Sequence, residues 1–62
     1  MKVAIVDLKM KIKVLGNTPE IVIPRVGENI NVGYNPYPKV KGVTYDYEEN
    51  LVYIVIDGYL FQ

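Results

Sequence analysis

The side chains of this 62-residue sequence that could do chemistry are six tyrosines, one arginine and a short acidic run. The sequence holds no Ser, Cys or His, so a nucleophile paired with a histidine base cannot be assembled. Glu48 and Glu49 are the closest pair of carboxylates, and they fall in a predicted hairpin tip exposed to water. General acid–base catalysis requires groups tuned by burial or by neighbouring charge, which a hairpin tip does not supply. The sequence therefore predicts a protein that binds and is not an enzyme.

The acidic run could also attract a cation. Oxygen ligands of the kind that calcium prefers are offered by Asp46, Glu48, Glu49 and Asn50. The run lacks the glycine-containing loop of a dedicated calcium site, and the sequence has none of the His or Cys residues that bind zinc. A solvated hairpin that protects a sheet edge accounts for the same residues. We expect no metal and no cofactor.

The candidate ligand-binding residues are Arg25, Tyr34, Tyr37 and Lys39. A tyrosine has a flat apolar ring with a polar tip, which suits both stacking on a ligand and packing on a sheet. Tyr34 and Tyr37 stand beside prolines in a predicted loop, where both roles remain open. Arg25 lies at a predicted turn, where its planar guanidinium could grip a phosphate at two points. The alternative for Arg25 is an ion pair with Glu28.

Charge is balanced overall but divided along the chain. Seven basic and seven acidic side chains give a formal net charge of zero, which argues against a protein that binds nucleic-acid phosphates. Residues 1–41 carry a balance of +4, and residues 42–62 carry a balance of −4. The two parts could be paired within one chain, or the basic part of one subunit could lie against the acidic part of another.

A chain of this length forms one domain, residues 1–62, and its core is marginal because so small a domain buries only about 60% of the surface of its unfolded chain. Small domains usually add a disulfide, a metal or a partner subunit. Without Cys or His, oligomerisation remains, so we expect a homo-oligomer. No stretch approaches the ~20 apolar residues of a membrane span. The absence of Cys favours a cytoplasmic protein without a membrane partner.

Alternation of apolar and polar residues predicts a set of short strands. It is strict from Asp7 to Val14, where the inward side consists of Leu8, Met10, Ile12 and Val14. Similar signals predict strands over residues 20–23, 29–34, 39–47 and 51–56, with a bulge at Gly42. Val, Ile and Thr supply 19 of the 62 residues, so no helix is expected. The predicted fold is all-β, a small five-stranded SH3-like or OB-like open barrel, with a two-sheet sandwich as the alternative.

Three segments carry apolar side chains at positions where a half-buried strand or a free chain end is normally polar. Residues 51–56 have no polar face, which is typical of a central strand or of one buried against a partner. Val3 and Ile5 make both sides of the first strand apolar, and a second subunit could cover one of them. The last residues include Tyr59, Leu60 and Phe61, which require something to pack on.

The segment IVIPRVGENI, residues 21–30, followed by residues 37–43 and the hairpin to Ile56, resembles many short phage and prophage β proteins. They share a strand, a Pro-Arg-apolar-Gly-Glu motif, a second strand and a hairpin. Some small phage proteins of this size are anti-defence sponges, which oligomerise and sequester the cyclic nucleotides that bacteria use as alarm signals. The resemblance implies such a role in the cytoplasm of a bacterial host.

Four hypotheses for function follow. The leading one is a homo-oligomeric phage-type protein that sequesters a small nucleotide at subunit interfaces lined by the four candidate residues. The second is an inhibitor or adaptor that docks a Tyr-rich face or a strand edge on a host protein. A module for single-stranded nucleic acid, using Lys9, Lys11 and Lys13, is disfavoured by the zero net charge. The fourth is a structural assembly protein.

Overall fold

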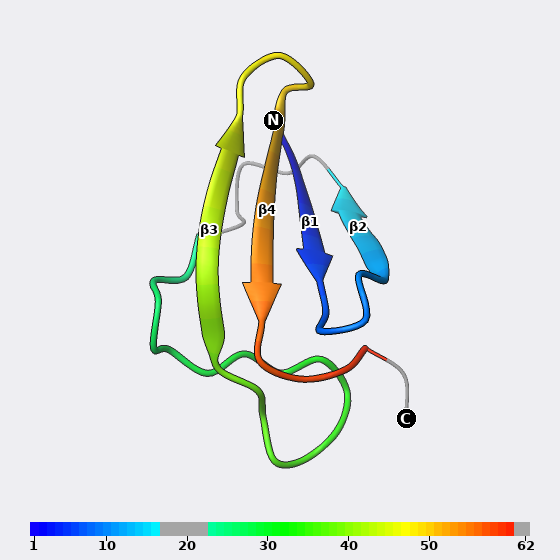
Figure 1. The fold of residues 1–62 in the computed structure, drawn as a ribbon, viewed down its shortest axis with the longest axis vertical. Helices are drawn as coiled ribbons and strands as arrows, with labels where there is room; N and C mark the ends of the chain where they lie inside the picture. The colour runs from blue at the N-terminus through cyan, green and yellow to red at the C-terminus, as the bar shows by residue number, and fades with distance from the viewer. Residues whose placement is uncertain (17–22, 61–62) are drawn as a thin grey trace.

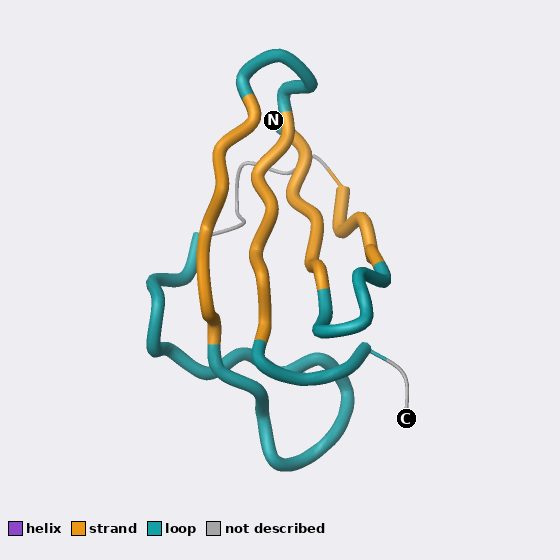
Figure 2. Tube along the Cα trace, viewed as in Figure 1, coloured by secondary structure: helices purple, strands orange, loops and turns teal. Residues whose placement is uncertain are grey.

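The computed structural model describes residues 1–16 and 23–60 as an all-β chain. Its strands are β1 (Lys2–Val6), β2 (Ile12–Gly16), β3 (Val40–Asp46) and β4 (Leu51–Ile56). They form one mixed sheet in the order β2-β1-β4-β3 (Figure 1, Figure 2). The described residues contain no helix, as the composition predicted, and so none that is long and apolar enough to cross a membrane.

Two antiparallel hairpins joined by a parallel pair make up the sheet. β1 pairs with β2, β3 pairs with β4, and β1 and β4 run parallel at the centre. β4 therefore has a neighbour on each side, which confirms the prediction of a central strand for residues 51–56. β2 and β3 lie at opposite edges of the sheet. The five-stranded barrel is thus not confirmed, because the described ranges form an open sheet of four strands.

One face of this sheet carries the hydrophobic core. Its buried cluster consists of Val3, Ile5, Val40, Ile54, Ile56 and Leu60. Residues 23–38 pass beside β3 and around the lower end of the sheet in Figure 1, and they bring Ile23, Ile30 and Val32 against that cluster. Burying an aliphatic side chain of this size contributes roughly 1.5–3 kcal/mol. The contacts that stabilise the sheet therefore also hold the long loop. Leu60 packs on the core, as predicted, whereas Phe61 lies outside the described residues.

The prediction of one strand from Asp7 to Val14 is wrong, because the chain reverses direction between β1 and β2. The Oδ1 atom of Asp7 accepts the backbone N–H groups of Lys9 at 2.8 Å and Lys11 at 2.9 Å, which a strand would have used elsewhere. Met10 adopts a positive φ of 64° within this turn. The residues predicted to face inward are consequently exposed: Leu8 by 42%, Met10 by 75%, Ile12 by 56% and Val14 by 57%.

Asp7 is the buried charged residue of the described chain, with 2% of its surface exposed. Besides the two contacts of its Oδ1 atom, its Oδ2 atom accepts the N–H of Leu60 at 3.0 Å. The N–H of Leu8 donates to the carbonyl of Gly58, also at 3.0 Å. The turn after β1 is thereby tied to the segment after β4.

The pKa of Asp7 reflects two opposing effects. Burial alone raises it, but the N–H donors of Leu60, Lys11 and Lys9, together with the charge of Lys11, outweigh burial. The pKa is therefore lowered from its ordinary value of 3.8. The folded state favours the ionised carboxylate.

The strand predicted over residues 29–34 is also wrong, since only a single bridge forms, between Asn29 and Lys39. Pro38 has no N–H to donate, so the ladder cannot continue in that direction. The Oδ1 atom of Asn31 accepts the backbone N–H two residues further on, at 2.8 Å, which turns the chain. As after Asp7, a local hydrogen bond between a side chain and the backbone replaces the strand pairing that the alternation of apolar and polar residues predicted.

The last two predicted strands are confirmed. β3 has a register shift between Val40 and Gly42, as expected for a bulge at Gly42. A turn over residues 47–50 leads into β4, and the Oδ1 atom of Asp46 caps it by accepting two N–H groups at 3.1 Å. The strand predicted over residues 20–23 lies, except for Ile23, outside the described residues, and Ile23 is not in a strand.

Replacing Asp7 by Asn should lower the melting temperature at neutral pH, because an amide offers one acceptor oxygen where the fold uses two. The amide nitrogen would then face the N–H of Leu60, donor against donor. Since the folded pKa is lowered, the wild-type advantage is fully present above 3.8 and is lost as the pH falls below that value toward the folded pKa. Thermal unfolding followed by circular dichroism should show the two proteins converging in acid.

The matched control for this prediction is Asp46→Asn. Asp46 also caps a turn, but only its Oδ1 atom accepts hydrogen bonds, and the amide oxygen of Asn replaces that acceptor. Its melting temperature should stay close to that of the wild type. Equal losses in the two variants would show that the second oxygen of Asp7 stabilises nothing.

Candidate functional site

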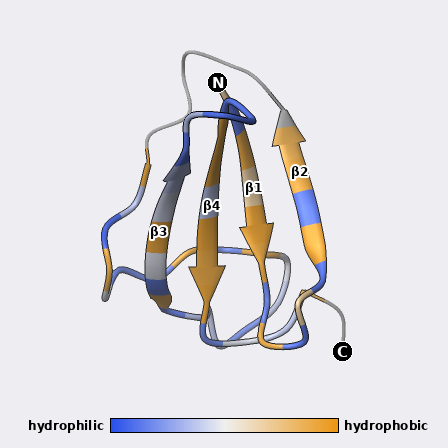
Figure 3. Cartoon of the chain, turned by 45° about the horizontal axis from the view of Figure 1, so that its top comes forward, coloured by the Kyte–Doolittle hydropathy of each residue, from blue (hydrophilic) through white to orange (hydrophobic). Residues whose placement is uncertain are grey.

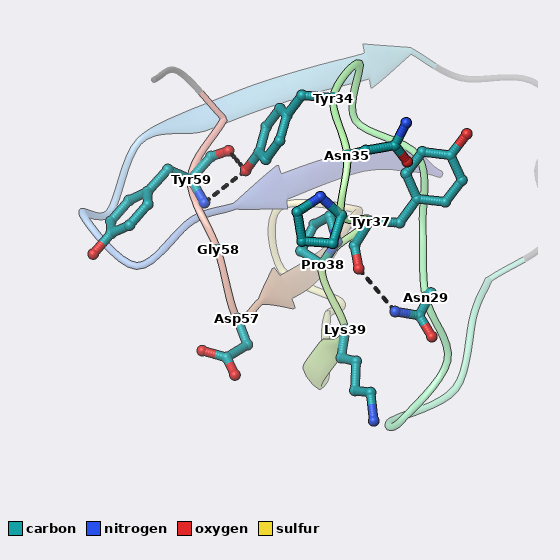
Figure 4. Close-up of a pocket in the computed structure, with 10 residues that line it drawn as sticks. Asn29, Tyr34, Asn35, Tyr37, Pro38, Lys39, Asp57, Gly58 and Tyr59 are labelled. Carbon is teal, nitrogen blue, oxygen red and sulfur yellow. Dashed lines mark hydrogen bonds between the residues drawn. The ribbon is translucent and has the colours of Figure 1, made fainter.

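A hollow of about 400 Å³ lies at the end of the sheet where β4 stops and β3 begins. Residues 34–39 form one wall, residues 57–59 form the other, and Asn29 completes the lining (Figure 4). The N–H of Asp57 donates to the carbonyl of Lys39 at 2.8 Å, so the two walls stay paired beyond the ends of the strands. The sheet therefore positions the hollow.

The hydroxyl of Tyr34 locks the two walls together. It accepts the backbone N–H of Tyr59 at 2.9 Å and donates to the carbonyl of the same residue (Figure 4). One hydroxyl thus satisfies both backbone groups of Tyr59. On the other side, the ammonium of Lys9 lies 5.3 Å from the centre of the Tyr59 ring, within the range of a cation–π contact. These contacts give Tyr34 a structural role.

Gly58 allows the walls to approach each other closely. A Cβ atom at this position would lie 2.8 Å from the Cβ of Pro38 and 3.4 Å from the hydroxyl oxygen of Tyr34. A side chain at position 58 would therefore force the walls apart, and the close contact of the two walls depends on this glycine.

Tyr37 presents an exposed aromatic ring at the edge of the hollow. The side-chain N–H of Asn29 donates to the carbonyl of Tyr37 at 2.8 Å, and that of Asn31 donates to its hydroxyl at 3.3 Å. One hydrogen bond thus holds the backbone of Tyr37 and another holds its hydroxyl, while the residue remains 43% exposed. A ring that is already fixed in position loses little entropy when a flat ligand stacks on it.

Lys39 and Asp57 place opposite charges at the rim of the hollow. Both residues are exposed, and in Figure 4 both side chains extend from their walls on the side away from Tyr34. An ammonium group attracts a phosphate, whereas a carboxylate accepts hydrogen bonds from hydroxyl and amino groups. The hollow thus combines an aromatic ring, amide groups and one charge of each sign.

Arg25 stands outside the lining of this hollow. Its side chain is 89% exposed, and one guanidinium nitrogen lies 3.9 Å from the carboxylate of Glu28. Its backbone N–H donates to the same carboxylate at 2.7 Å. The ion pair that the sequence offered as an alternative is therefore present. It is exposed and contributes little to stability, so the guanidinium is free to exchange Glu28 for another anion.

Three of the four candidate residues line the hollow, namely Tyr34, Tyr37 and Lys39. The sequence analysis missed Asn29, Asp57 and Tyr59. Asp57 and Tyr59 directly follow a correctly predicted strand, and that position could have marked them as a wall at the end of the sheet. Their pairing with Lys39 depends on the register of two strands, which no local pattern encodes.

The acidic run at the tip of the β3–β4 hairpin does not assemble a metal site. Within residues 1–16 and 23–60, no group of three or more acidic side chains is placed to hold a metal ion. Asp46 instead accepts the backbone N–H groups of Glu48 and Glu49. Capping of a turn thus accounts for the residue that opens this run.

Tyr34→Phe should lower the free energy of unfolding by roughly 1–2 kcal/mol, since each lost hydrogen bond costs about 1 kcal/mol. The ring would still fill its place against the wall. Urea unfolding measures the loss, and Tyr47→Phe is the control because Tyr47 is 81% exposed. The control should change stability by less than about 0.5 kcal/mol. A Tyr34→Phe variant as stable as the control would contradict the locking role.

Comparisons with known proteins identify no relative. No family model matches the chain, and neither a curated protein nor a solved structure matches it significantly.

Proposed function

We propose that this chain is a non-enzymatic binding protein whose hollow takes a small nucleotide. The observation that carries the proposal is the convergence of Tyr37, Lys39 and Asp57 on one hollow of about 400 Å³. That volume falls within the range of about 300–1,000 Å³ typical of small-molecule sites. A sequence without Ser, Cys or His supports retention of the ligand and not its conversion.

Each part of a nucleotide has a matching group in the hollow. The ring of Tyr37 suits stacking on a base, which is worth about 1–3 kcal/mol in other proteins. The amides of Asn29 and Asn35 suit the donors and acceptors on the edge of a base. Lys39 attracts the phosphate, and Asp57 accepts hydrogen bonds from ribose hydroxyls.

The bound nucleotide would be sequestered, that is, held by the protein without being converted. The resemblance to small phage proteins implies removal of a nucleotide alarm signal in the cytoplasm of a bacterial host. A sponge of this kind needs affinity and abundance but no catalytic group. A homo-oligomer would add stability to a small core and multiply the sites.

Lys39→Gln should weaken nucleotide binding about 10-fold to 100-fold, since a charge-assisted hydrogen bond contributes about 1.5–3 kcal/mol. Isothermal titration calorimetry with cyclic mononucleotides and cyclic dinucleotides measures this effect. Lys41→Gln is the matched control, because Lys41 is an exposed lysine two residues away that does not line the hollow. Equal affinity in the two variants, or no binding by wild-type protein, would refute the site.

Arg25→Gln should weaken a ligand with two phosphates about tenfold and leave a ligand with one phosphate unaffected. The reason is that Lys39 takes the first phosphate, while the loop that carries Arg25 leads directly into Asn29 of the lining. The same calorimetry compares cyclic dinucleotides with cyclic mononucleotides, and circular dichroism checks the fold. Unchanged affinity for both ligands would remove Arg25 from the site and leave the hollow in place.

Docking on a host protein is the second candidate function, and one observation favours it. β2 is an edge strand, and its outer side pairs with no strand of the described chain. An extended segment of a partner could add to such an edge. A pull-down from bacterial lysate that recovered a stoichiometric partner, together with no nucleotide binding, would favour this function over sequestration.

A further inference from the structure

The face of the sheet opposite the core is apolar as well. Strand register places Ala4, Val6, Ile12, Val14, Tyr53 and Val55 together on this surface, which we call the open face. Figure 3 shows that β1, β2 and β4 are hydrophobic along most of their length. A sheet that meets water on one side normally alternates apolar and polar residues. The open face departs from that pattern.

The open face is exposed mainly along β2, because Ala4 and Val6 are only 0% and 6% exposed and Tyr53 and Val55 are half-buried. Residues 23–38 pack on the other face of the sheet, the core side, through Ile23, Ile30 and Val32. Ile12 and Val14 are 56% and 57% exposed. A depression of about 340 Å³ lies on this face between Met10 and Tyr53. Contiguous apolar surface of this kind marks a site of association.

We propose that the open face binds the open face of a second copy of this chain, with the strands of the two copies running in opposite directions. Such a pairing is isologous, because each copy contributes the same surface. It goes beyond the nucleotide site, since the open face shares no residue with the hollow.

Charge at the two ends of the sheet sets this orientation. The β3–β4 turn carries Glu48 and Glu49, and Asp46 precedes it. The β1–β2 turn carries Lys9 and Lys11, and it lies at the opposite end of the sheet (Figure 1). Reversed strands place the acidic end of each copy over the basic end of the other. Strands running in the same direction would instead stack like charges, which costs free energy.

The same charge pattern selects a second copy over other occupants. An anionic membrane or a nucleic acid would be attracted at one end of the open face and repelled at the other. A copy of this chain matches both ends at once, because Glu48 and Glu49 lie at one end of the sheet and Lys9 and Lys11 at the other. Around the β1–β2 turn and the start of β3, the basic side chains Lys9, Lys11 and Lys39 outnumber Asp7 and Asp57 by one. At the other end of the sheet, Asp46, Glu48 and Glu49 outnumber Lys2 by two.

The size of the open face predicts a modest affinity. Four strands about 4.8 Å apart, each about five residues long, cover a footprint of roughly 300 Å². A standard interface buries ~800 Å² on each partner. We therefore expect a dissociation constant in the micromolar range that rises with salt concentration, because charge contributes to it.

Sedimentation equilibrium from low micromolar to millimolar protein tests the surface. Ile12→Glu should raise the dissociation constant of the dimer at least about 30-fold, because it buries an unpaired charge at the interface. Val26→Glu is the control, since Val26 is 64% exposed and lies in the loop off this face. Wild-type protein that stays monomeric at millimolar concentration, or an unaffected Ile12→Glu dimer, would overturn the proposal. Circular dichroism verifies that both variants fold.

A charge exchange tests the orientation. Glu48→Lys with Glu49→Lys makes both ends basic, and Lys9→Glu with Lys13→Glu makes the basic end acidic. Each double variant alone should dimerise at least about tenfold more weakly than the wild type, whereas an equimolar mixture should form a one-to-one heterodimer in native mass spectrometry. The mixture should prefer the heterodimer whichever way the strands run, so the orientation is read from each double variant alone. Strands running in the same direction already oppose like charges in the wild type, so a double variant that dimerises as tightly as the wild type would overturn the reversed orientation.

The two proposals fail separately. Ile12→Glu retains every residue of the hollow, so calorimetry on that variant reads nucleotide binding without the dimer. Wild-type protein that dimerises but binds no nucleotide would refute the proposed function and leave the interface. A monomer that binds nucleotide would refute the interface and leave the function.

Discussion

The carboxylate of Asp7 is the contact on which the rest of the described structure depends. A buried charge is costly unless its hydrogen bonds are satisfied, and here the backbone N–H groups of Lys9, Lys11 and Leu60 satisfy it. The first two donors reverse the chain after β1, and the third fixes the segment after β4. One side chain therefore ends the first strand, sets the start of the second and brings Leu60 into the core.

The hydrogen bonds around Asp7 also determine the geometry of the hollow. Its second wall, residues 57–59, is held on both sides: Asp57 bonds to Lys39, and Gly58 bonds to Leu8 beside the buried carboxylate. The hydroxyl of Tyr34 then attaches the first wall to the second. Contacts made far from the exposed ring of Tyr37 thus determine the space in front of it. The hydrogen bonds that anchor Leu60 in the core also fix the second wall of the hollow, so a small domain can keep the shape of the hollow defined.

Local signals sufficed where they coincided with strand pairing. In β3 and β4 the apolar pattern, the glycine at position 42 and the turn over residues 47–50 all indicate the same hairpin, and it was predicted. The reversal after Asp7 carries no such signal, since Met10 takes the positive φ and the turn is made by side-chain bonds to the backbone. Tyr34, Tyr37 and Lys39 could be grouped from their proximity in sequence. Asp57 joins them through long-range register, which a local pattern does not contain.

A four-stranded sheet in a short chain has two faces and two edges, and the described loops cover one face. The β2 edge carries one charged residue, Lys13, which would meet the same residue of a second copy if the two paired edge to edge in antiparallel fashion about that position. Lys41 lies on the other edge strand, β3. The open face has no such guard. The charges stand instead at its two ends, with opposite signs, where they favour a reversed second copy and oppose one in the same direction. In the dimer that we propose, the opposite charges at the two ends of the sheet would direct association toward a face, where it closes at two copies, and away from the edges, where pairing could propagate.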